Sequence, residues 1–332
     1  MTEANSNENL TAPILAARAA YLVGVAGRAP SLHNTQPWRF AVSGDAIELY
    51  ADARRQLHVD PDGREMVISC GAALYGLRLA MRSLGYLPEV ELLPRPAGQR
   101  VLARVWPGCP APMTSDERKL LHAVLHRHTH RGPFDREPLP TSLFARLQGD
   151  AGAEGAILTE IEPGPAREEL MALATASGDK QARDPRSRAE TWWWSRDVTS
   201  TARDGVPAHA FPAGPSRQGS RLPQRDFDLG RGLGLLPAGG PDPPVTAVLF
   251  TTGDGERDWL RAGQALHRLL LHAASQWVFA SLNTQPLEDA ATRSLIRDRL
   301  ALPGAPQMLL ALGVSRTAHP TARRPATDLI EP

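Results

Sequence analysis

The sequence predicts an α+β protein of two tandem halves, residues 13–112 and 113–330, which follow a flexible N-terminus over residues 1–12. The 332 residues have the length of two domains of ~150 residues each. Strand-like runs bounded by turn residues alternate with helices whose apolar residues recur every three or four positions. One helical pattern, GAALYGLRLAMRSLGY, returns in the second half as GQALHRLLLHAASQWV. Residues 183–244 hold nine prolines with many glycines and arginines, which predicts a loop-rich insertion.

The composition is typical of a soluble, cytoplasmic, globular protein. Hydrophobic residues make up 42% of the chain and charged residues 22%. The formal net charge of +1 gives no general attraction to nucleic acid or to an anionic membrane. No apolar run approaches the ~20 residues of a membrane span, and the polar start MTEANSNENLTA is unlike a secretory signal. The two cysteines, Cys70 and Cys109, are too few for a disulfide scaffold and indicate a reducing compartment.

The first half is predicted to contain two helices and two pairs of strands. Pro13 lies near the first turn of an amphipathic helix that Gly27 closes. Leu74, Leu77 and Met81 have the spacing of a buried helix. The predicted elements are a helix over 13–27, a strand–turn–strand unit in RFAVSGDAIELYAD at 39–52, a helix over 64–85, and short strands in LPEVELLP at 87–94 and RVLARVWP at 100–107.

The second half is predicted to begin with a helix in SDERKLLHAVLHRHTHRG. Ser115, with Arg118 one turn later, is a candidate cap without the full capping box. The insertion 183–244 is predicted to be a partly ordered lid anchored by the run of tryptophans 192–194. The other predicted elements are a helix over 141–148, a strand in VTAVLFTTGD at 245–254, the repeated helix from 263, a final strand in PQMLLALGV at 306–314 and a basic tail, TARRPATDL.

The repeated helix indicates an internal duplication. Five positions of the first copy match positions of the second, and flanking strands recur with the helix. The alternative is that two unrelated helices share similar packing requirements. The matched positions are Gly71, Ala73, Leu74, Leu77 and Leu79 with Gly263, Ala265, Leu266, Leu269 and Leu271.

A polar, proline-bracketed run, APSLHNTQPWRF, follows the first predicted helix. Ser31, His33, Asn34, Thr35 and Gln36 place five hydrogen-bonding side chains within six positions. A shorter echo, SLNTQP, stands at 281–286. Because the echo follows the repeated helix whereas the first run precedes it, the echo is not a copy of the same element, and coincidence stays open.

A second candidate site is basic. Arg127, Thr129 and Arg131 alternate in RHTHRG, and two guanidinium groups with a hydroxyl suit a phosphate. The alternative is a solvated helix end, where Arg and His complement the helix dipole. The pair Arg323 and Arg324 follows the last predicted strand and is either part of the same site or a charged tail.

Other chemistries find little support in the sequence. His126, His128 and His130 can bind zinc, yet no CxxC or HExxH pattern accompanies them, and no metal is predicted. No GxSxG occurs, and Cys70 has the context of a small packed residue. The GRGLG at 230–234 lies inside the insertion and does not open a βαβ unit. A nicotinamide would therefore act as a passing substrate without a dedicated Rossmann fold.

The polar run and the basic segment together suit a flavin mononucleotide (FMN). Asn34 and Gln36 offer both a donor and an acceptor, which matches the alternating edge of a flavin ring. Pro30 would stiffen the loop and so lower the entropy lost on ordering it. Arg127 and Arg131 would bind the phosphate. The site would then be built from both halves.

These motifs resemble the nitroreductase superfamily and, more closely, its Acg-type branch. APSLHNTQPWRF is similar to the family's proline–serine–x–x–asparagine–x–glutamine–proline–tryptophan loop, and RHTHRGPFDREPLP to its arginine–x–serine/threonine–x–arginine segment. The resemblance covers most of residues 13–330. It extends to DGVP at 204–207, GQALHRLLLHAA, QPLED, LALPGAPQMLLALGV and RRPATDL.

The resemblance implies that the two halves imitate, in one chain, the homodimer of ordinary nitroreductases. It implies a single FMN, because the NTQPW loop occurs only in the first half and the arginine motif only in the second. It also implies that the ring-binding group includes Pro30, Ser31, His33, Asn34 and Gln36, and the phosphate-binding group Arg127, Thr129, Arg131, Arg323 and Arg324. Trp277-Val278-Phe279 departs from the family's usual glycine–leucine and predicts a reshaped pocket floor.

The predicted function is an FMN-dependent oxidoreductase that moves electrons between NAD(P)H or an organic substrate and an electrophilic acceptor. The expected partners are small molecules, with neither nucleic acid nor membrane, and the fused halves favour a monomer. No side chain is assigned as acid or base, because the flavin carries the chemistry. The alternative is a protein that sequesters FMN beneath the lid without turnover.

Overall fold

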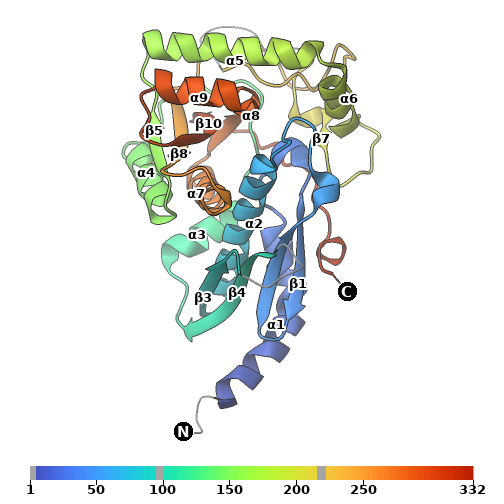
Figure 1. Cartoon of the computed structure of the whole chain (residues 1–332), viewed down its shortest axis with the longest axis vertical. Helices are drawn as coiled ribbons and strands as arrows, with labels where there is room; N and C mark the ends of the chain where they lie inside the picture. The colour runs from blue at the N-terminus through green and yellow to red at the C-terminus, as the bar shows by residue number, and fades with distance from the viewer. Residues whose placement is uncertain (1–4, 95–100, 215–221, 332) are drawn as a thin grey trace.

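Two four-stranded antiparallel sheets, one in each half of the chain, lie on either side of a central pair of helices (Figure 1). The computed structural model describes residues 5–94, 101–214 and 222–331. The central helices are α2 (Arg64–Ser83) and α7 (Glu256–Ala274), which pack against each other more extensively than any other pair of elements described. They are the two helices that the sequence repeat aligns. The predicted α+β fold of two tandem halves is therefore confirmed.

The first sheet has the strand order β1-β2-β4-β3, and its strands are those predicted. The β1–β2 hairpin pairs Ser43 with Ala46 across a two-residue turn, and Gly44 supplies the positive φ of 62° that such a turn requires. The strands are β1 (Trp38–Ser43), β2 (Ala46–Ala51), β3 (Tyr86–Leu92) and β4 (Val101–Pro110).

The first helix begins earlier than predicted. Helix α1 spans Asn5–Ala26, so residues 5–12 are helical where a flexible N-terminus was expected, and residues 1–4 lie outside the described part. Pro13 lies within this helix. A proline inside a helix removes one backbone hydrogen bond and crowds the carbonyl group of the preceding turn, yet α1 continues through this position. A proline alone therefore does not locate the start of a helix.

Helix α3 (Ser115–Ala123) begins as predicted, but its cap is one residue earlier. The Thr114 side chain accepts a bond from the backbone N–H of Glu117 at 3.1 Å, and the Glu117 carboxylate accepts one from the backbone N–H of Thr114 at 2.7 Å. This is a complete capping box. The prediction of Ser115 as a cap without a full box was wrong, because the glutamate lies three residues after Thr114 and not after Ser115.

The insertion contains more regular structure than predicted. Helix α6 (Pro185–Trp194) is new, and it ends in the run of tryptophans. Trp192 and Trp193 are 56% and 64% exposed, so the prediction that the tryptophans anchor a lid was wrong for these two. The described part of the insertion has its own buried cluster, which includes Val206, Phe211 and Phe227. Sequence alone does not say which aromatic side chains of a loop-rich region become buried.

The second sheet has the order β5-β8-β10-β9, again antiparallel. Its outer face carries the long helix α5 together with α9 (Figure 1). Strand β5 and helix α5 were not predicted. The remaining elements are α4 (Leu143–Ala153), β5 (Ile157–Glu160), α5 (Pro165–Arg183), β6 (Ser195–Arg196), β7 (Val206–Pro207), β8 (Val245–Thr251), β9 (Val278–Asn283), α8 (Gln285–Glu288), α9 (Ala290–Arg299) and β10 (Ala305–Val314).

The C-terminal tail returns to the first sheet. The backbone N–H of Phe40 in β1 donates to the carbonyl oxygen of Leu329 at 2.8 Å, and the N–H of Glu331 donates to the carbonyl oxygen of Phe40 at 2.7 Å. The last residues of the second half therefore extend the sheet of the first half. The division of the chain at residue 112 stays a prediction.

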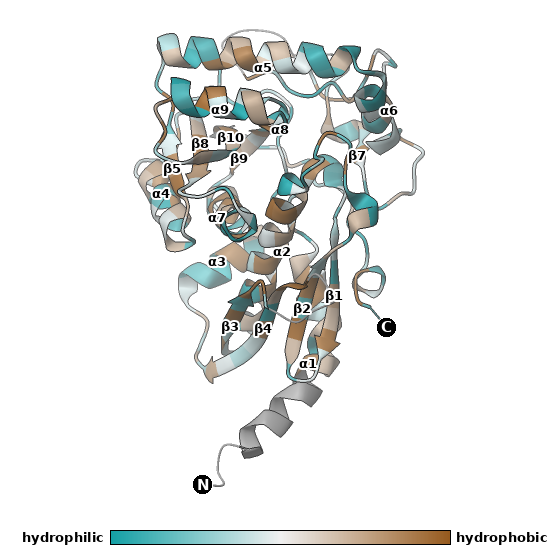
Figure 2. Cartoon of the chain, in the orientation of Figure 1, coloured by the Kyte–Doolittle hydropathy of each residue, from teal (hydrophilic) through white to brown (hydrophobic). Residues whose placement is uncertain are grey.

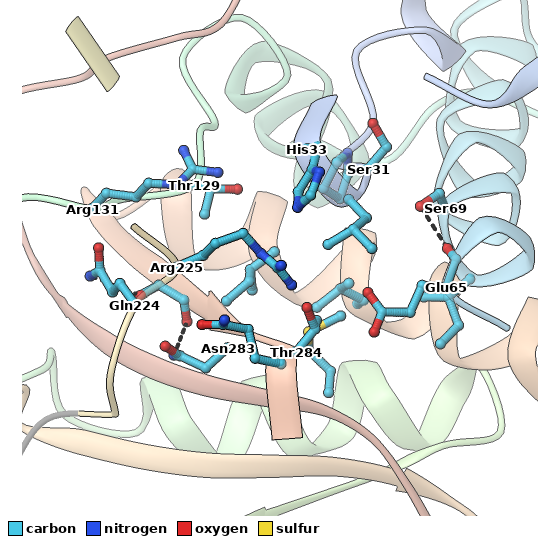
Figure 3. Close-up of a pocket in the computed structure, with 18 of the residues that line it drawn as sticks. Ser31, His33, Glu65, Ser69, Thr129, Arg131, Gln224, Arg225, Asn283 and Thr284 are labelled. Carbon is cyan, nitrogen blue, oxygen red and sulfur yellow. Dashed lines mark hydrogen bonds between the residues drawn. The ribbon is translucent and has the colours of Figure 1, made fainter. Parts of the chain in front are cut away.

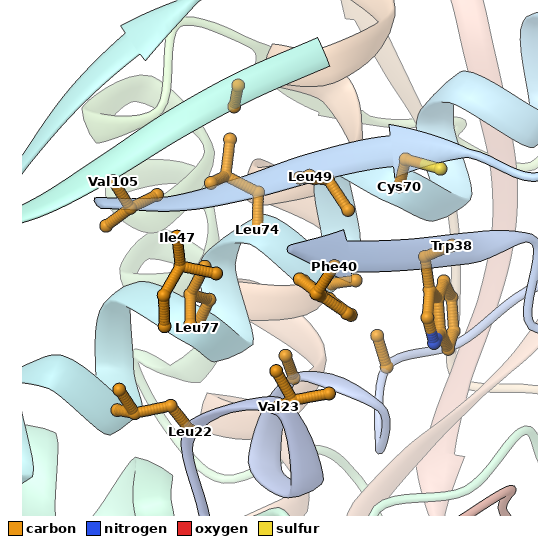
Figure 4. Packing of buried hydrophobic residues seen from close by; sticks show 14 of the residues in the cluster. Leu22, Val23, Trp38, Phe40, Ile47, Leu49, Cys70, Leu74, Leu77 and Val105 are labelled. Atoms are coloured by element: carbon orange, nitrogen blue, oxygen red, sulfur yellow. The ribbon is translucent and has the colours of Figure 1, made fainter. Parts of the chain in front are cut away.

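The hydrophobic residues follow this architecture. Figure 2 shows them along the strands and α2, whereas α5 carries many hydrophilic residues. Trp38, Phe40 and Leu74 pack together without solvent exposure between β1 and α2 (Figure 4). Cys70 belongs to the same cluster, as its sequence context predicted. In the described ranges, no helix combines the length and apolar character needed to cross a membrane.

Candidate functional site

The NTQP loop (residues 30–37) has a strained backbone that its own side chains hold in place. His33, Asn34 and Gln36 have positive φ angles of 51°, 56° and 52°. Such angles cost a non-glycine residue on the order of 1 kcal/mol or more. Asn34 offsets part of this cost, because its Nδ2 donates to the carbonyl oxygen of Gly205 at 2.9 Å.

The side-chain amides of Asn34 and Gln36 bind the NTQP loop to two distant segments, the insertion and the C-terminal tail. Asn34 also donates to the carbonyl oxygen of Ala322 in the tail at 3.1 Å. The Gln36 Nε2 donates to the carbonyl oxygen of Arg203 in the insertion at 2.8 Å, and its Oε1 accepts from the backbone N–H of Arg324 at 2.8 Å. Both side chains are buried. Nδ2 of Asn34 and both polar atoms of the Gln36 amide bind backbone groups, whereas Oδ1 of Asn34 is buried without a hydrogen-bond partner among the described residues. The structure thus gives them a clamping role.

A cavity lies between the NTQP loop, the start of α2 and the end of β9 (Figure 3). The space free of protein atoms at this cavity is about 730 Å³, a volume that includes open solvent at its mouth. Both halves and the insertion contribute to its wall. The polar and charged residues among those that line it are Ser31, His33, Glu65, Ser69, Thr129, Arg131, Gln224, Arg225, Ser281, Asn283, Thr284 and Gln285.

A cluster of arginines lies beside this cavity. Arg127 is only 4% exposed, and its burial together with the neighbouring Arg131 and Arg28 lowers the pKa of its guanidinium to about 10. The Arg323 side chain is half-buried, and burial of its guanidinium group, followed by the positive charges of Arg127, Arg28 and Arg131, holds its pKa well below the usual range. Arg127 and Arg323 both donate to the carbonyl oxygen of Arg28, at 3.2 and 3.4 Å, so their guanidinium groups are neighbours.

This arginine cluster lacks charge compensation within the described ranges. Nε and Nη1 of Arg127 and Nε of Arg323 are buried without a hydrogen-bond partner. The described charges that act on Arg127 and Arg323 are all positive. Burying unpaired cations is costly. The cluster therefore has the character of an anion-binding site, and the alternative of a solvated helix end does not apply to the buried Arg127, since α3 ends at Ala123.

Another part of the cavity wall is held by a hydrogen-bond network from the insertion. Arg225 donates to Oε1 of Glu288 at 2.5 Å and to Oε1 of Gln181 at 3.0 Å. Gln181 in turn donates to Oε2 of Glu288 at 2.6 Å, and Thr284 donates to Oε1 of the same carboxylate at 3.0 Å. The side chains of Arg225 and Glu288 are 8% and 2% exposed. This network fastens the insertion to α5 and α8 beside the cavity.

Several buried polar atoms around the cavity have no partner among the described residues. Both ring nitrogens of His33, Oε1 of Gln224 and Oδ1 of Asn283 are in this state. The His33 ring lies edge-on to Phe227 of the insertion, with ring centroids 5.3 Å apart. Burial, followed by the charges of Arg225 and Arg131, holds the pKa of His33 well below its usual range. His33 therefore presents a neutral imidazole that can both donate and accept a hydrogen bond.

The structure divides the ten predicted site residues into two groups. Five line the cavity and five do not. Among the latter, Arg324 donates through Nη2 to the carbonyl oxygen of Asp328 at 2.7 Å. The roles of all ten toward a cofactor stay predictions. The lining residues are Pro30, Ser31, His33, Thr129 and Arg131, and those outside the lining are Asn34, Gln36, Arg127, Arg323 and Arg324.

The sequence reasoning missed one side of the cavity. The echo SLNTQP supplies residues 281–285 of the lining, directly across from residues 30–33 of the NTQP loop. The two similar runs therefore meet at one cavity although they belong to different elements. The echo was the signal that could have found them. Nothing in the sequence singled out Glu65, Ser69, Gln224, Arg225 or Phe227.

The histidines near the arginine cluster bind protein groups. His126 contacts the carbonyl oxygen of Ala274 at 3.0 Å through Nε2, and His130 contacts that of Pro133 at 2.9 Å through Nε2. His128 bonds to the carbonyl oxygen of His126 at 3.1 Å. Within the described residues, no three histidine, cysteine or acidic side chains are grouped to hold a metal ion.

The aromatic residues after α7 do not form a pocket floor, contrary to the expectation from the sequence. Trp277 is 49% exposed and stacks on His126, with ring centroids 5.4 Å apart. Phe279 is buried against His128. Neither residue lines the cavity. Trp277 has a φ of 58°, a conformation that favours glycine, and directs its side chain outward from the helix end.

Comparisons with known proteins agree with the motifs. A Mycobacterium tuberculosis protein (strain H37Rv) named "Putative NAD(P)H nitroreductase Rv3131" is 33% identical over 317 residues, which are 92% of this chain and 89% of the relative. "Putative NAD(P)H nitroreductase acg" of the same strain is 29% identical over 313 residues, 92% of this chain and 93% of the relative. No protein-family model matches this chain.

A solved nitroreductase with bound FMN, from Desulfitobacterium hafniense DCB-2, aligns with 64% of this chain and 97% of its own, at 16% identity and a TM-score of 0.39. The stronger finding is the identity to Rv3131 over nearly the whole of both chains. Because that identity extends across both halves and the insertion, the chain belongs to the nitroreductase family, in its Acg-type branch.

Proposed function

We propose that this protein is an FMN-dependent oxidoreductase that takes reducing equivalents from NAD(P)H and passes them to a small electrophilic acceptor. One observation carries the proposal: the buried guanidinium group of Arg127 and the half-buried Arg323 beside it have no anionic partner among the described residues. A phosphate dianion would compensate their charge and satisfy their free N–H groups. Relatives named as NAD(P)H nitroreductases support the choice of chemistry.

The residues present fit FMN at both of its ends. Arg127 and Arg323 would hold the phosphate, with Thr129 and Arg131 reaching from the same segment into the cavity. The unpartnered atoms of His33 and Asn283 would then meet the polar edge of the ring. Bound FMN supplies reversible hydride and electron transfer. The chain's own residues bind and orient it, and the walls of the cavity restrict the access of water.

Sequestration of FMN is the competing function, and one observation favours it. The insertion contributes Gln224, Arg225 and Phe227 to the cavity wall, and the ion pair of Arg225 with Glu288 holds it in place. A wall fastened in this way would exclude a second ligand unless it opens. The two functions therefore differ in whether a nucleotide reaches the cavity.

The purified protein, loaded with FMN, separates the two functions when it is mixed anaerobically with NADH and, separately, NADPH. Loss of the visible flavin absorbance supports the oxidoreductase, and the faster nucleotide identifies the donor. Absorbance that persists at a large excess of both nucleotides supports sequestration. Failure to bind FMN contradicts both. Size-exclusion chromatography of the same sample tests the monomer that the fused halves favour.

A further inference from the structure

Glu65 occupies an unusual place for a carboxyl group. It stands in the first turn of α2, its side chain is 3% exposed, and it lines the cavity. Figure 3 shows the carboxyl group pointing across the cavity toward Thr284. Among the described residues, the one hydrogen bond to this carboxyl group comes from Nη2 of Arg64, at 2.9 Å from Oε1. The second oxygen, Oε2, is left to the cavity.

Arg64 does not compensate Glu65 fully, because it is shared. Its Nη1 donates to the carbonyl oxygen of Gln307 and to Oε1 of the same residue, both at 3.0 Å. Its Nη2 also lies 3.4 Å from the carbonyl oxygen of Leu287. The other nearby cation, Arg225, is bound to Glu288. Glu65 is thus a buried carboxyl group whose only hydrogen-bonded cation among the described residues, Arg64, also binds other groups.

The surrounding charges favour the neutral acid. Burial is the largest cause, followed by the negative charge of Glu288, and together with Asp60 they raise the pKa of Glu65 to about 8 in spite of Arg64 and Arg225. Arg293 of α9 also acts on this group but is paired with Asp254. At neutral pH Glu65 therefore carries a proton that can be donated into the cavity.

A purely structural role does not require an acid at this position. A glutamine has the same shape, and its amide oxygen would accept the same bond from Arg64. It would also avoid the cost of a buried ionisable group. What a glutamine lacks is a transferable proton. This difference makes Glu65→Gln the informative substitution.

We propose that Glu65 is the proton donor for the acceptor reduced in this cavity, an inference that rests on the proposed function. The acceptor class is an electrophile whose two-electron reduction consumes one hydride and one proton, such as a nitro compound or a quinone. The O–H bond of Glu65 breaks as the proton bonds to an acceptor oxygen. For a nitro compound, hydride plus proton gives the nitroso compound and water. The carboxylate left behind pairs with Arg64 and regains a proton from solvent.

The first test needs neither cofactor nor turnover. The FMN-free protein, labelled with ¹³C at the glutamate carboxyl carbons, is titrated by NMR. One resonance is expected to titrate near pH 8 and to be missing from Glu65→Gln, and Glu65→Asp serves for assignment if the glutamine variant does not fold. The inference is overturned if every glutamate carboxyl group titrates in the usual acidic range.

The second test follows the acceptor half-reaction of FMN-loaded, pre-reduced protein by stopped flow. Wild-type rates are expected to fall above about pH 8, where Glu65 loses its proton. Glu65→Gln should be slower by ~10²–10⁴-fold and should lose this pH dependence. The matched control is Glu160→Gln on β5, a carboxyl group whose pKa burial also raises but which lies outside the cavity.

The two tests separate the inference from the function on which it rests. If Glu65→Gln keeps the rate and the pH profile of wild type, the proton-donor role is overturned, even when bound FMN turns over. Protein that never binds FMN overturns the proposed function, whereas the NMR titration still reports whether Glu65 holds a proton at neutral pH. A slow Glu160→Gln variant would show that the loss is not specific to the cavity and would also count against the inference.

Discussion

Gly71 of α2 and Gly263 of α7 face each other where the two central helices cross. A β-carbon on Gly263 would lie 2.0 Å from the carbonyl oxygen of Ile68 and 2.8 Å from the Cα of Gly71. One on Gly71 would lie 2.3 Å from the carbonyl oxygen of Leu260. The sequence repeat aligns these same two glycines. Equivalent positions of the two halves thus meet at the centre of the molecule, which supports a duplication over similar packing alone.

Gly263→Ala is expected to destabilise the protein by ~1–3 kcal/mol or more, because the added methyl group meets backbone atoms that cannot rotate away. Urea denaturation measures the change. Gly149→Ala is the control: Gly149 lies in α4 with nothing within 4 Å of an added β-carbon. It should stabilise the helix by ~0.5–1 kcal/mol. Equal effects of the two substitutions would contradict the close crossing of α2 and α7.

The central helices and most strands could be predicted because their signals are local. The alternation of apolar and polar residues predicts the β1–β2 hairpin, and apolar residues spaced three and four positions apart predict α2 and α7. Burial in the insertion is not a local property. Trp192 and Trp193 belong to the one run of three aromatic residues in that region of the sequence, yet they are exposed, while Phe211 is buried. Which aromatic side chain is covered depends on chain segments that sequence spacing does not bring together.

The candidate site shows the same limit. The sequence indicated that Asn34 and Gln36 belong to a functional loop, but the partners of Asn34, Gly205 and Ala322, lie 171 and 288 residues from it. A motif gives the identity of a hydrogen-bonding group without its partner. The arginine segment was easier to interpret, because Arg127 keeps its charge in any environment and needs an anion when it is buried.

Arg127→Met is expected to have opposite effects on folding and on anion binding. Without ligand, the variant should be more stable than wild type, because a buried unpaired cation is replaced by an apolar side chain of similar length. FMN affinity should fall by ~1.5–3 kcal/mol, the scale of a charged hydrogen bond. Thermal denaturation and fluorescence titration with FMN measure the two quantities.

Inorganic phosphate provides a simpler probe of the same arginine cluster. It should raise the melting temperature of FMN-free wild type, since a ligand that binds only the folded state stabilises it, and should do so less for Arg127→Met. Arg183→Met, at the exposed end of α5, is the matched control and should respond like wild type. If Arg127→Met is more stable than wild type and binds FMN with the same affinity, the phosphate of FMN does not bind at Arg127.

Asn34→Gly tests the clamp between the NTQP loop and the insertion. Glycine accepts the positive φ at no cost, so the substitution removes only the two bonds to Gly205 and Ala322. The expected loss is ~1–3 kcal/mol of stability, with faster proteolysis of the exposed segment 197–203. Asn34→Asp should be worse, because a buried carboxylate would face two carbonyl oxygens. Equal proteolysis of Asn34→Gly and wild type would mean that the amide does not hold the insertion.

His267 makes the stability of the folded protein depend on pH. It is fully buried between α7 and α2, where its Nδ1 lies 2.6 Å from the carbonyl oxygen of Ala72, and burial lowers its pKa to about 3. Because the unfolded chain binds a proton near pH 6.5 and the folded chain does not, stability from this group is lost as pH falls from about 6.5 toward 3. Between pH 7 and 5 the loss is about 2 kcal/mol.

His267→Asn keeps a donor near the position of Nδ1 and removes the titration. It should be less stable than wild type at pH 7, because the smaller side chain leaves space in the core. Its free energy of unfolding should nevertheless fall by about 2 kcal/mol less than that of wild type between pH 7 and pH 5. His122→Asn, on the exposed face of α3, should leave the pH dependence unchanged. Glu65 contributes a pH dependence of the opposite sign: because its pKa is raised to about 8, the free energy of unfolding falls as pH rises from about 4.5 to 8. Wild type and variant share this contribution, so the difference between them reports His267 alone. If the free energy of unfolding of His267→Asn falls between pH 7 and 5 by as much as that of wild type, the imidazole of His267 is protonated in the folded state.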